Sequence, residues 1–303
     1  MSLSTVKPST FHSGCITPVM SGYLYVIAAG VMWGLQGPLS KYCQFHGVSP
    51  MEVAFWRAFV GSILFFIHGA LIGALRVPSR HMAIFSLFGI VSVGVQFSIM
   101  QVAIRESGAA LSSVLLYTAP VWVALLSRLL FKETLTRRKA TSLIVALGGV
   151  VLICASGGGL VGQEPSVLGI SLGLLSGLIY AVIVIFYNYW RPLYSTASVY
   201  PFMMMVGAVT LFCFVDISLG WNPGVWLALI AIGALTCYGA FYAHGKSLHR
   251  LSPVKVAVLC NLEPVVSTFI SWLWWDERFS ALGWLGCLTV IAAMFYLSAE
   301  RER

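Results

Sequence analysis

Charged residues are scarce in this sequence. Of its 303 residues, 18 are Lys or Arg and 10 are Asp or Glu, together 9% of the chain, whereas 59% are hydrophobic. Soluble globular proteins average roughly 25% charged residues. So little charge cannot cover a surface that faces water, which excludes a soluble enzyme. A membrane-spanning helix needs about 20 mostly apolar residues, so the chain has room for about ten spans and little else.

The sequence also lacks the short motifs of metal, disulfide and nucleotide chemistry. Its seven cysteines are scattered without a Cys-x-x-Cys spacing, and no His-Glu-x-x-His occurs. Gly245-Lys246-Ser247 resembles the end of a phosphate-binding loop, but Ala240 occupies the place of its first glycine. We therefore expect no cofactor, no metal and no ATP-driven step. The net charge of +8 predicts basic loops on one side of a membrane rather than a nucleic-acid partner.

Hydropathy and loop-forming residues predict an all-α polytopic membrane protein with ten transmembrane helices. The predicted spans cover residues 22–42, 51–74, 81–103, 109–131, 139–156, 168–190, 198–219, 224–246, 253–275 and 282–298. The corresponding domains are a cytoplasmic N-terminal tail (1–21), a first five-span unit (22–156), an external loop (157–167), a second five-span unit (168–299) and a cytoplasmic C-terminal tail (300–303).

Lys and Arg are unevenly distributed among the predicted loops. With the N-terminus in the cytoplasm, 13 of them fall in cytoplasmic segments, and only Lys41, Arg105 and Arg278 fall on the other side. Cytoplasmic loops of membrane proteins carry such an excess of positive charge. The bias favours ten spans with both termini in the cytoplasm.

The two halves of the chain resemble each other at a nearly constant offset. A shift of 144 residues aligns Pro120 with Pro264, and a shift of 147 aligns Trp33 with Tyr180. Five spans is an odd number, so two such units in one chain must lie in opposite orientations in the membrane. Inverted repeats of this kind are common in secondary transporters, which bind substrate near the bilayer midplane between the repeats.

The arrangement of a few residues resembles a known family. The features that carry this resemblance are Trp33-Gly34 in the first span, Arg57 in the second, and the pairs Pro120/Glu133 and Pro264/Glu277. Together they resemble the ten-span EamA-type branch of the drug/metabolite transporter superfamily. Within that branch the chain most resembles the bacterial exporters of aromatic amino acids. The resemblance implies a transporter in the bacterial inner membrane with a small aromatic or amphipathic substrate.

Glu263 is the most informative single residue of the predicted spans. It lies near the centre of the ninth span, where a carboxylate is costly and usually faces a cavity or a partner. Its repeat counterpart is Ala119, so the symmetry of the fold does not require it. Two interpretations remain open: a contact with a substrate amine or a proton, and a neutral carboxyl group hydrogen-bonded to a neighbouring helix.

Aromatic and amide side chains within the predicted spans complete the candidate site. A buried Tyr hydroxyl needs a hydrogen-bond partner, so several of them favour a cavity with polar groups over ordinary helix packing. The predicted substrate-binding residues are Trp33, Gln36, Tyr117, Tyr180, Tyr238, Tyr242, Asn261 and Glu263. Pro120 and Pro264 are predicted to kink the fourth and ninth spans and to act as hinges. Arg57 is close enough to the predicted outer face to extend towards it, and either an ion pair or substrate binding explains it.

The predicted function is alternating-access export of small amphipathic metabolites, with aromatic amino acids as the leading class. Other amino acids and cationic drugs are alternatives. An intramembrane enzyme is the alternative from another class. It would need two facing carboxylates at depth, but Asp216 and Asp276 lie at predicted span ends, leaving Glu263 alone. The expected partners are the substrate and the lipid bilayer, while the coupling ion and the oligomeric state stay open.

Overall fold

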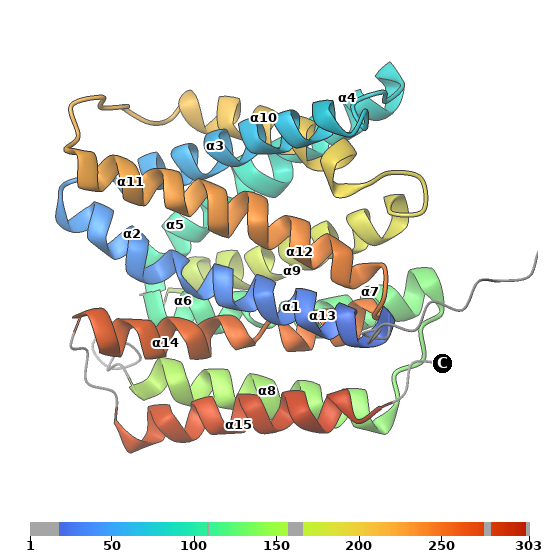
Figure 1. Ribbon diagram of the computed structural model, residues 1–303. Helices are drawn as coiled ribbons and strands as arrows, with labels where there is room; N and C mark the ends of the chain where they lie inside the picture. Colours follow the sequence, from blue (N-terminus) through green and yellow to red (C-terminus); the bar gives the residue numbers. More distant parts are fainter. Residues whose placement is uncertain (1–17, 108, 157–165, 276–279, 301–303) are drawn as a thin grey trace, which may run out of the picture.

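A computed structural model describes residues 18–107, 109–156, 166–275 and 280–300, and every regular element in these segments is helical (Figure 1). In chain order the elements are α1 (Pro18–Gly34), α2 (Gln36–Phe45), α3 (Pro50–Leu71), α4 (Ser79–Gly89), the π-helix η1 (Ile90–Val95), α5 (Gln96–Ser107), α6 (Ala109–Leu116), α7 (Ala119–Phe131), α8 (Arg137–Ser156), α9 (Val167–Trp190), α10 (Thr196–Phe212), α11 (Pro223–Ala231), the π-helix η2 (Ile232–Gly239), α12 (Ala240–Leu248), α13 (Pro253–Leu259), α14 (Leu262–Trp275) and α15 (Ala281–Ser298).

These elements form ten spans, which confirms the predicted all-α polytopic fold. In the described segments, nine continuous or broken helices are long and apolar enough to cross a membrane, and the remaining span, α10, has 17 residues. The predicted N-terminal tail falls almost entirely outside the described residues, as do most of the predicted loop 157–167 and Glu277. Near the start of α1 and at the end of α15, the Tyr23 hydroxyl donates a 3.3 Å hydrogen bond to the Ser298 carbonyl. We call the end of the bundle where these helices meet the terminal face.

The seventh span ends earlier than its hydropathy predicts. It was expected to reach residue 219, but α10 ends at Phe212 and the chain continues as a loop. Glu52, which is 2% exposed at the start of α3, accepts hydrogen bonds from the backbone N–H of Ser218 at 3.1 Å and from Trp221 Nε1 at 2.9 Å. These bonds hold the segment 213–222 as a loop against α3.

Packing between the two halves follows a pseudo-two-fold relation. The second span, α3, packs on its counterpart α10, and the fifth span, α8, packs on its counterpart α15. Likewise α1 packs on α12, while α9, the counterpart of α1, packs on α5. Figure 1 shows α8 and α15 as a separate pair along one side of the bundle. Helices of both units therefore surround the centre, as an inverted repeat requires.

Glycines allow close crossings at equivalent places in the two units. A Cβ atom on Gly61 of α3 would clash with Cys237 Sγ in η2. A Cβ atom on Gly207 of α10 would clash with the Cβ of Val93 in η1. Each crossing therefore depends on the absence of a side chain. Small residues serve this purpose in membrane helix packing.

The fourth and ninth spans are each divided into two half-helices. The breaks lie at residues 117–118 and 260–261, which are 143 residues apart and so fall within one residue of the 144-residue offset of the repeat. We expected Pro120 and Pro264 to kink continuous helices, but both lie in the first turn of the half-helix that follows the break. The first N–H groups of a helix have no intrahelical acceptor, so a proline there removes no helical hydrogen bond. Whether the breaks act as hinges remains a prediction.

Candidate functional site

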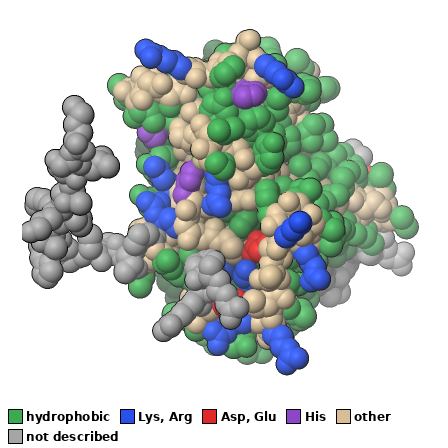
Figure 2. All heavy atoms as spheres, turned by 90° about the vertical axis from the view of Figure 1, so that its right-hand side faces the viewer, with side chains coloured by type: hydrophobic (Ala, Val, Ile, Leu, Met, Phe, Trp, Pro, Cys, Tyr) green, Lys and Arg blue, Asp and Glu red, His purple; other side chains and the backbone are tan. Residues whose placement is uncertain are grey.

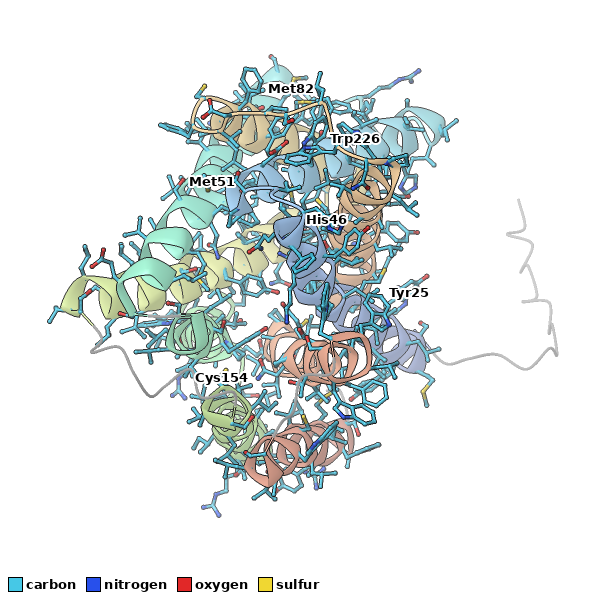
Figure 3. All side chains as sticks on the ribbon, turned by 90° about the vertical axis from the view of Figure 1, so that its left-hand side faces the viewer. Tyr25, His46, Met51, Met82, Cys154 and Trp226 are labelled. Carbon is cyan, nitrogen blue, oxygen red and sulfur yellow. The ribbon has the colours of Figure 1, made fainter. Side chains whose placement is uncertain are left out.

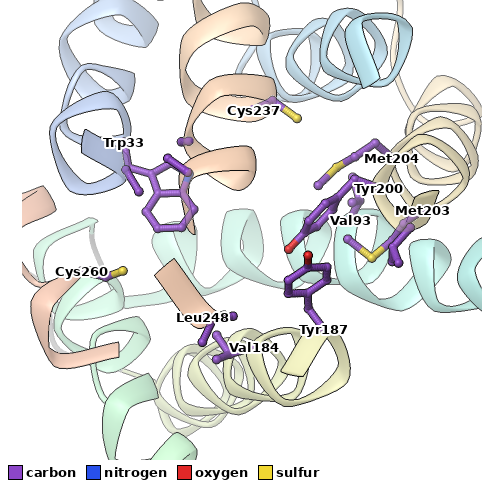
Figure 4. Packing of buried hydrophobic residues seen from close by; sticks show 14 of the residues in the cluster. Trp33, Val93, Val184, Tyr187, Tyr200, Met203, Met204, Cys237, Leu248 and Cys260 are labelled. Carbon is purple, nitrogen blue, oxygen red and sulfur yellow. The ribbon is translucent and has the colours of Figure 1, made fainter. Parts of the chain in front are cut away.

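Trp33 lies at the centre of the bundle, where helices of both units meet. It is 3% exposed and packs in the main apolar core together with Val184, Leu248 and Cys260 (Figure 4). Its ring centroid lies 5.3 Å from that of Phe241 in α12, with the ring planes at 79°.

Two further rings complete this central aromatic cluster. The ring centroid of Tyr180 in α9 lies 6.3 Å from that of Trp33 at 71°, and the centroid of His244 lies at 5.3 Å. Edge-to-face pairs of this kind stabilise packing by about 0.5–1.5 kcal/mol beyond the area that they bury. Trp33 and Tyr180, which the sequence repeat pairs, are therefore in contact across the two units.

Glu263 lies beside this cluster, in the first turn of α14 after the helix break. The Tyr117 hydroxyl, at the equivalent break of the first unit, donates a hydrogen bond to its carboxylate. Glu263 also interacts electrostatically with Arg57 and Tyr180. Asn261, 3% exposed, lies at the same break. The two breaks thus bring one acidic and several hydroxyl or amide groups to the centre of the membrane-spanning bundle.

Arg57 extends into the bundle rather than towards its outer face, contrary to the expectation from its position in the sequence. Its Nη2 atom donates a 3.3 Å hydrogen bond to the Thr236 carbonyl in η2. Its guanidinium carbon lies 5.5 Å from the ring centroid of Phe97 in α5. The contact with Thr236 is available because α3 crosses η2 closely at Gly61.

A small cavity adjoins Arg57 and the central aromatic cluster. Its volume is about 40 Å³. The lining residues are Arg57, Ala58, Ser92, Val93, Phe97, Ile183, Met203, Met204, Cys237 and Phe241. This volume admits a few water molecules but not an amino acid. In this conformation the cavity is therefore smaller than an amino acid.

A second, more polar pocket lies at the terminal face. Its volume is about 60 Å³, and its lining includes His68, Tyr242, Lys246 and His249. The Tyr238 hydroxyl lies 3.1 Å from His68 Nδ1, and the ring centroids of Tyr238 and Tyr242 are 6.2 Å apart. Two predicted substrate-binding residues, Tyr238 and Tyr242, thus lie around this pocket and not around Glu263.

The terminal face carries positive charge. Figure 2 shows Lys, Arg and His side chains across this end of the molecule. Burial lowers the pKa of His249, and the neighbouring charges of Arg191, Lys246 and Arg250 lower it further.

The opposite end of the bundle faces the viewer in Figure 3, and His46 and Trp226 are labelled there. The remaining predicted residue, Gln36, is half-buried in the first turn of α2.

Comparison with known proteins shows which family has this arrangement. The family model described as "EamA-like transporter family" matches the chain twice, over residues 20–155 and 167–299. The chain belongs to the EamA-like transporter family. It is therefore a multi-pass membrane protein of a transporter family built from two repeats, and its expected substrate is a small molecule.

Relatives of this EamA-like transporter come from bacteria and archaea. "Uncharacterized transporter YdfC" of Bacillus subtilis is 22% identical over 256 residues, which cover 83% of this chain and 82% of the relative. "Uncharacterized transporter YoaV" of the same organism is 25% identical, with 90% and 94% covered. An "Uncharacterized transporter" of Archaeoglobus fulgidus is 23% identical, with 88% and 93% covered.

A solved structure shares the fold of this EamA-like transporter. It carries the name "Crystal structure of protein", and it superimposes with a TM-score of 0.78 at 20% sequence identity. The match covers 91% of this chain and 96% of the other. At this identity the likeness concerns the fold alone.

Sequence reasoning missed several residues that line the centre of this EamA-like transporter. Ser92 and Phe97 belong to η1 and α5, and Phe241 and His244 belong to α12. A single Ser or Phe in an apolar span carries no signal that separates a cavity wall from ordinary packing. Arg57 did carry a signal, because a charge inside a span usually faces the bundle interior.

Within the described segments, no group of three or more His, Cys, Asp or Glu side chains could hold a metal ion.

Proposed function

We propose that this protein exports small amphipathic metabolites, with aromatic amino acids as the leading class, by alternating access. The observation that supports this proposal is the aromatic cluster around Trp33, which adjoins the Glu263 carboxylate at the junction of the two inverted units. Flat rings that pack edge-to-face suit an aromatic side chain, and a carboxylate suits an ammonium group.

The small central cavity fits a transporter that must rearrange before it binds its substrate. A volume of about 40 Å³ cannot hold an aromatic amino acid, so the site must widen on one side before substrate enters. Inverted repeats supply two such arrangements, because exchanging the conformations of the two units opens the opposite side. With both termini in the cytoplasm of a bacterium, substrate enters from the terminal face and leaves on the other side of the inner membrane.

Export of other amino acids or of cationic drugs is the alternative within the same class. Glu263 and the surrounding rings would also suit an organic cation, since a cation is attracted to aromatic faces. Arg57, which interacts electrostatically with Glu263, favours a substrate that carries a negative group as well. We therefore rank amino acids above pure cations.

Transport by the purified protein in liposomes tests this proposal. Labelled tryptophan, phenylalanine and non-aromatic amino acids would be compared, with and without a pH gradient, against empty liposomes. We expect tryptophan and phenylalanine to cross fastest, and Trp33→Ala to slow both by about tenfold or more, which corresponds to the loss of an aromatic pair and its buried area. Uptake of non-aromatic compounds alone would refute the aromatic assignment.

A further inference from the structure

Two polar groups in the wall of the central cavity have no hydrogen-bond partner among the residues that the structure describes. They are the Nε atom of Arg57 and the hydroxyl oxygen of Ser92, both buried. Ser92 is 4% exposed and belongs to η1, whereas Arg57 approaches from α3. Buried polar groups are normally paired, and leaving one unpaired destabilises the folded state. A cavity that retains two such groups is therefore prepared for a polar ligand.

The guanidinium of Arg57 has donors to spare. Among the described residues it makes one hydrogen bond, to the Thr236 carbonyl, and a contact with the face of Phe97, but no close ion pair with a carboxylate. A guanidinium carries five N–H donors in a rigid plane, and two of them match the two oxygens of a carboxylate. Among the described residues, the carboxyl group that acts on Arg57 is that of Glu263, through an electrostatic interaction.

The rest of the cavity wall is apolar. Phe97 and Phe241 contribute aromatic rings, and Phe241 also packs on Trp33 at 5.3 Å. Phe241 therefore belongs both to the cavity wall and to the central aromatic cluster. Tyr180 interacts electrostatically with both Arg57 and Glu263, so the positive and the negative group both lie near this tyrosine.

We propose that the cavity is a carboxylate subsite in which Arg57 and Ser92 bind the carboxylate of the substrate while Glu263 faces its ammonium group. The inference rests on the proposed function and narrows it: the substrate is an α-amino acid zwitterion, and the decarboxylated amine is a poor ligand. The small volume of the cavity suits a carboxylate group, and the side chain of the substrate extends towards Trp33. In the empty protein, Arg57 and Glu263 compensate each other's charge, and the zwitterion satisfies both when it binds.

Binding of matched pairs with and without the carboxylate tests this proposal. Calorimetry of the full-length protein in detergent would compare tryptophan with tryptamine, phenylalanine with phenethylamine, and leucine with isopentylamine. We expect each amino acid to bind at least about tenfold more tightly than its amine, because the amine lacks the charged carboxylate that Arg57 and Ser92 would hydrogen-bond. Equal binding within every pair, or tighter binding of the amines, would overturn the carboxylate subsite.

Two variants separate substrate binding from support of the fold. Ser92→Ala should weaken binding of the amino acids severalfold and leave that of the amines unchanged. Arg57→Lys keeps the positive charge near Glu263 but loses the planar pair of donors, and it should weaken amino-acid binding by about tenfold or more. Ser62→Ala is the matched control, because Ser62 is a fully buried serine on α3 that donates to the Phe59 carbonyl and does not line the cavity.

The outcomes distinguish this inference from the proposed function. If Ser92→Ala and Arg57→Lys weaken the amines and the amino acids equally, Arg57 only stabilises the site and the subsite is refuted, while aromatic export stands. If leucine binds and the aromatic amino acids do not, the aromatic assignment is refuted, and the leucine pair still decides the carboxylate subsite. If the wild-type protein binds none of the three amino acids, both proposals are refuted.

Discussion

Glu263 and Glu52 are two carboxylates of the described bundle with contrasting surroundings. Glu52 accepts hydrogen bonds from Trp221, Ser218 and, at 3.4 Å, Trp56, which is a structural arrangement at the edge of the bundle. Glu263 receives a hydrogen bond from Tyr117 and faces Arg57 across the centre. The same residue type therefore has a structural role at one position and a proposed binding role at the other.

Replacing Glu263 by Gln tests the binding role. We expect Glu263→Gln to lower the rate of tryptophan transport by about tenfold or more, because the ammonium group loses its charged partner. The amide keeps the shape of the side chain and still accepts a hydrogen bond from Tyr117, so the Tm in detergent should stay close to that of the wild type. Unchanged transport would remove Glu263 from the mechanism.

Glu52→Ala is the structural counterpart of that experiment. It leaves the donors of Ser218 and Trp221 unpaired, and we expect the free energy of unfolding to fall by about 1–3 kcal/mol. The transport rate per folded molecule should not change, since Glu52 lies in the first turn of α3, outside both pockets. A variant that lost transport but kept its stability would contradict the structural assignment.

His249 makes stability at the terminal face depend on pH. Its pKa is lower in the folded protein than the usual value of about 6.5, because of burial and the charges of Arg191, Lys246 and Arg250. Below about pH 6.5 the unfolded chain binds a proton at this imidazole more readily than the folded chain does, so stability falls as the pH falls. Between about pH 7.5 and pH 5.5, the Tm of His249→Gln should therefore decrease less than that of the wild type. An equal decrease would show that His249 contributes nothing.

At the scale of helices, glycines bring α1 and α9 against the two helix breaks. A Cβ atom on Gly34 would lie 2.6 Å from Val266 of α14, and one on Gly177 would lie 2.8 Å from the Leu115 carbonyl of α6. We expect Gly34→Ala to lower the free energy of unfolding in detergent by about 1–3 kcal/mol through overpacking. Gly148→Ala in α8 is the control, because its Cβ would meet nothing within 4 Å. A better helix former there should stabilise slightly, and equal effects of the two changes would refute the close-packing argument.

Hydropathy predicted the spans well but not their internal breaks. The predicted second-half span 253–275 coincides with α13 and α14 together, yet no pattern showed that the helix is interrupted at residues 260–261. A proline indicates that a helix is disturbed nearby, but the position of the break depends on which carbonyls the neighbouring helices satisfy. The π-helices η1 and η2 were missed for a similar reason, because their sequences are as apolar as those of ordinary spans.

The candidate site was predicted in part. The charge of Glu263 and the repeat relation of Trp33 and Tyr180 identified three residues that the fold brings together at its centre. The position of a residue along a span predicts its depth in the membrane. It does not predict on which side of the helix the residue lies when the whole helix is apolar. Tyr238 and Tyr242 therefore seemed equivalent to Tyr180 in the sequence, although the fold places them beside His68.

For the whole molecule, the mechanism depends on two units that lie in opposite orientations. The packing of α3 on α10 and of α8 on α15 relates the units by a two-fold axis, and the unequal loop charge predicts that the terminal face is cytoplasmic. Alternating access follows only if both features hold in a membrane. Single cysteines at the two ends of the bundle can test the orientation directly.

The test uses two exposed residues at opposite ends of the bundle, Gln44 near the end of α2 and Ser79 at the start of α4. Each would be replaced by Cys in a Cys15→Ser, Cys213→Ser background, because Cys213 is exposed. In right-side-out vesicles an impermeant maleimide should label Gln44→Cys at once, and Ser79→Cys only after permeabilisation. The Cys15→Ser, Cys213→Ser protein without a new cysteine is the control, because it shows how much of the labelling comes from the remaining cysteines. Immediate labelling of Ser79→Cys, with protection of Gln44→Cys, would reverse the orientation, so that substrate entering from the terminal face would be imported instead of exported.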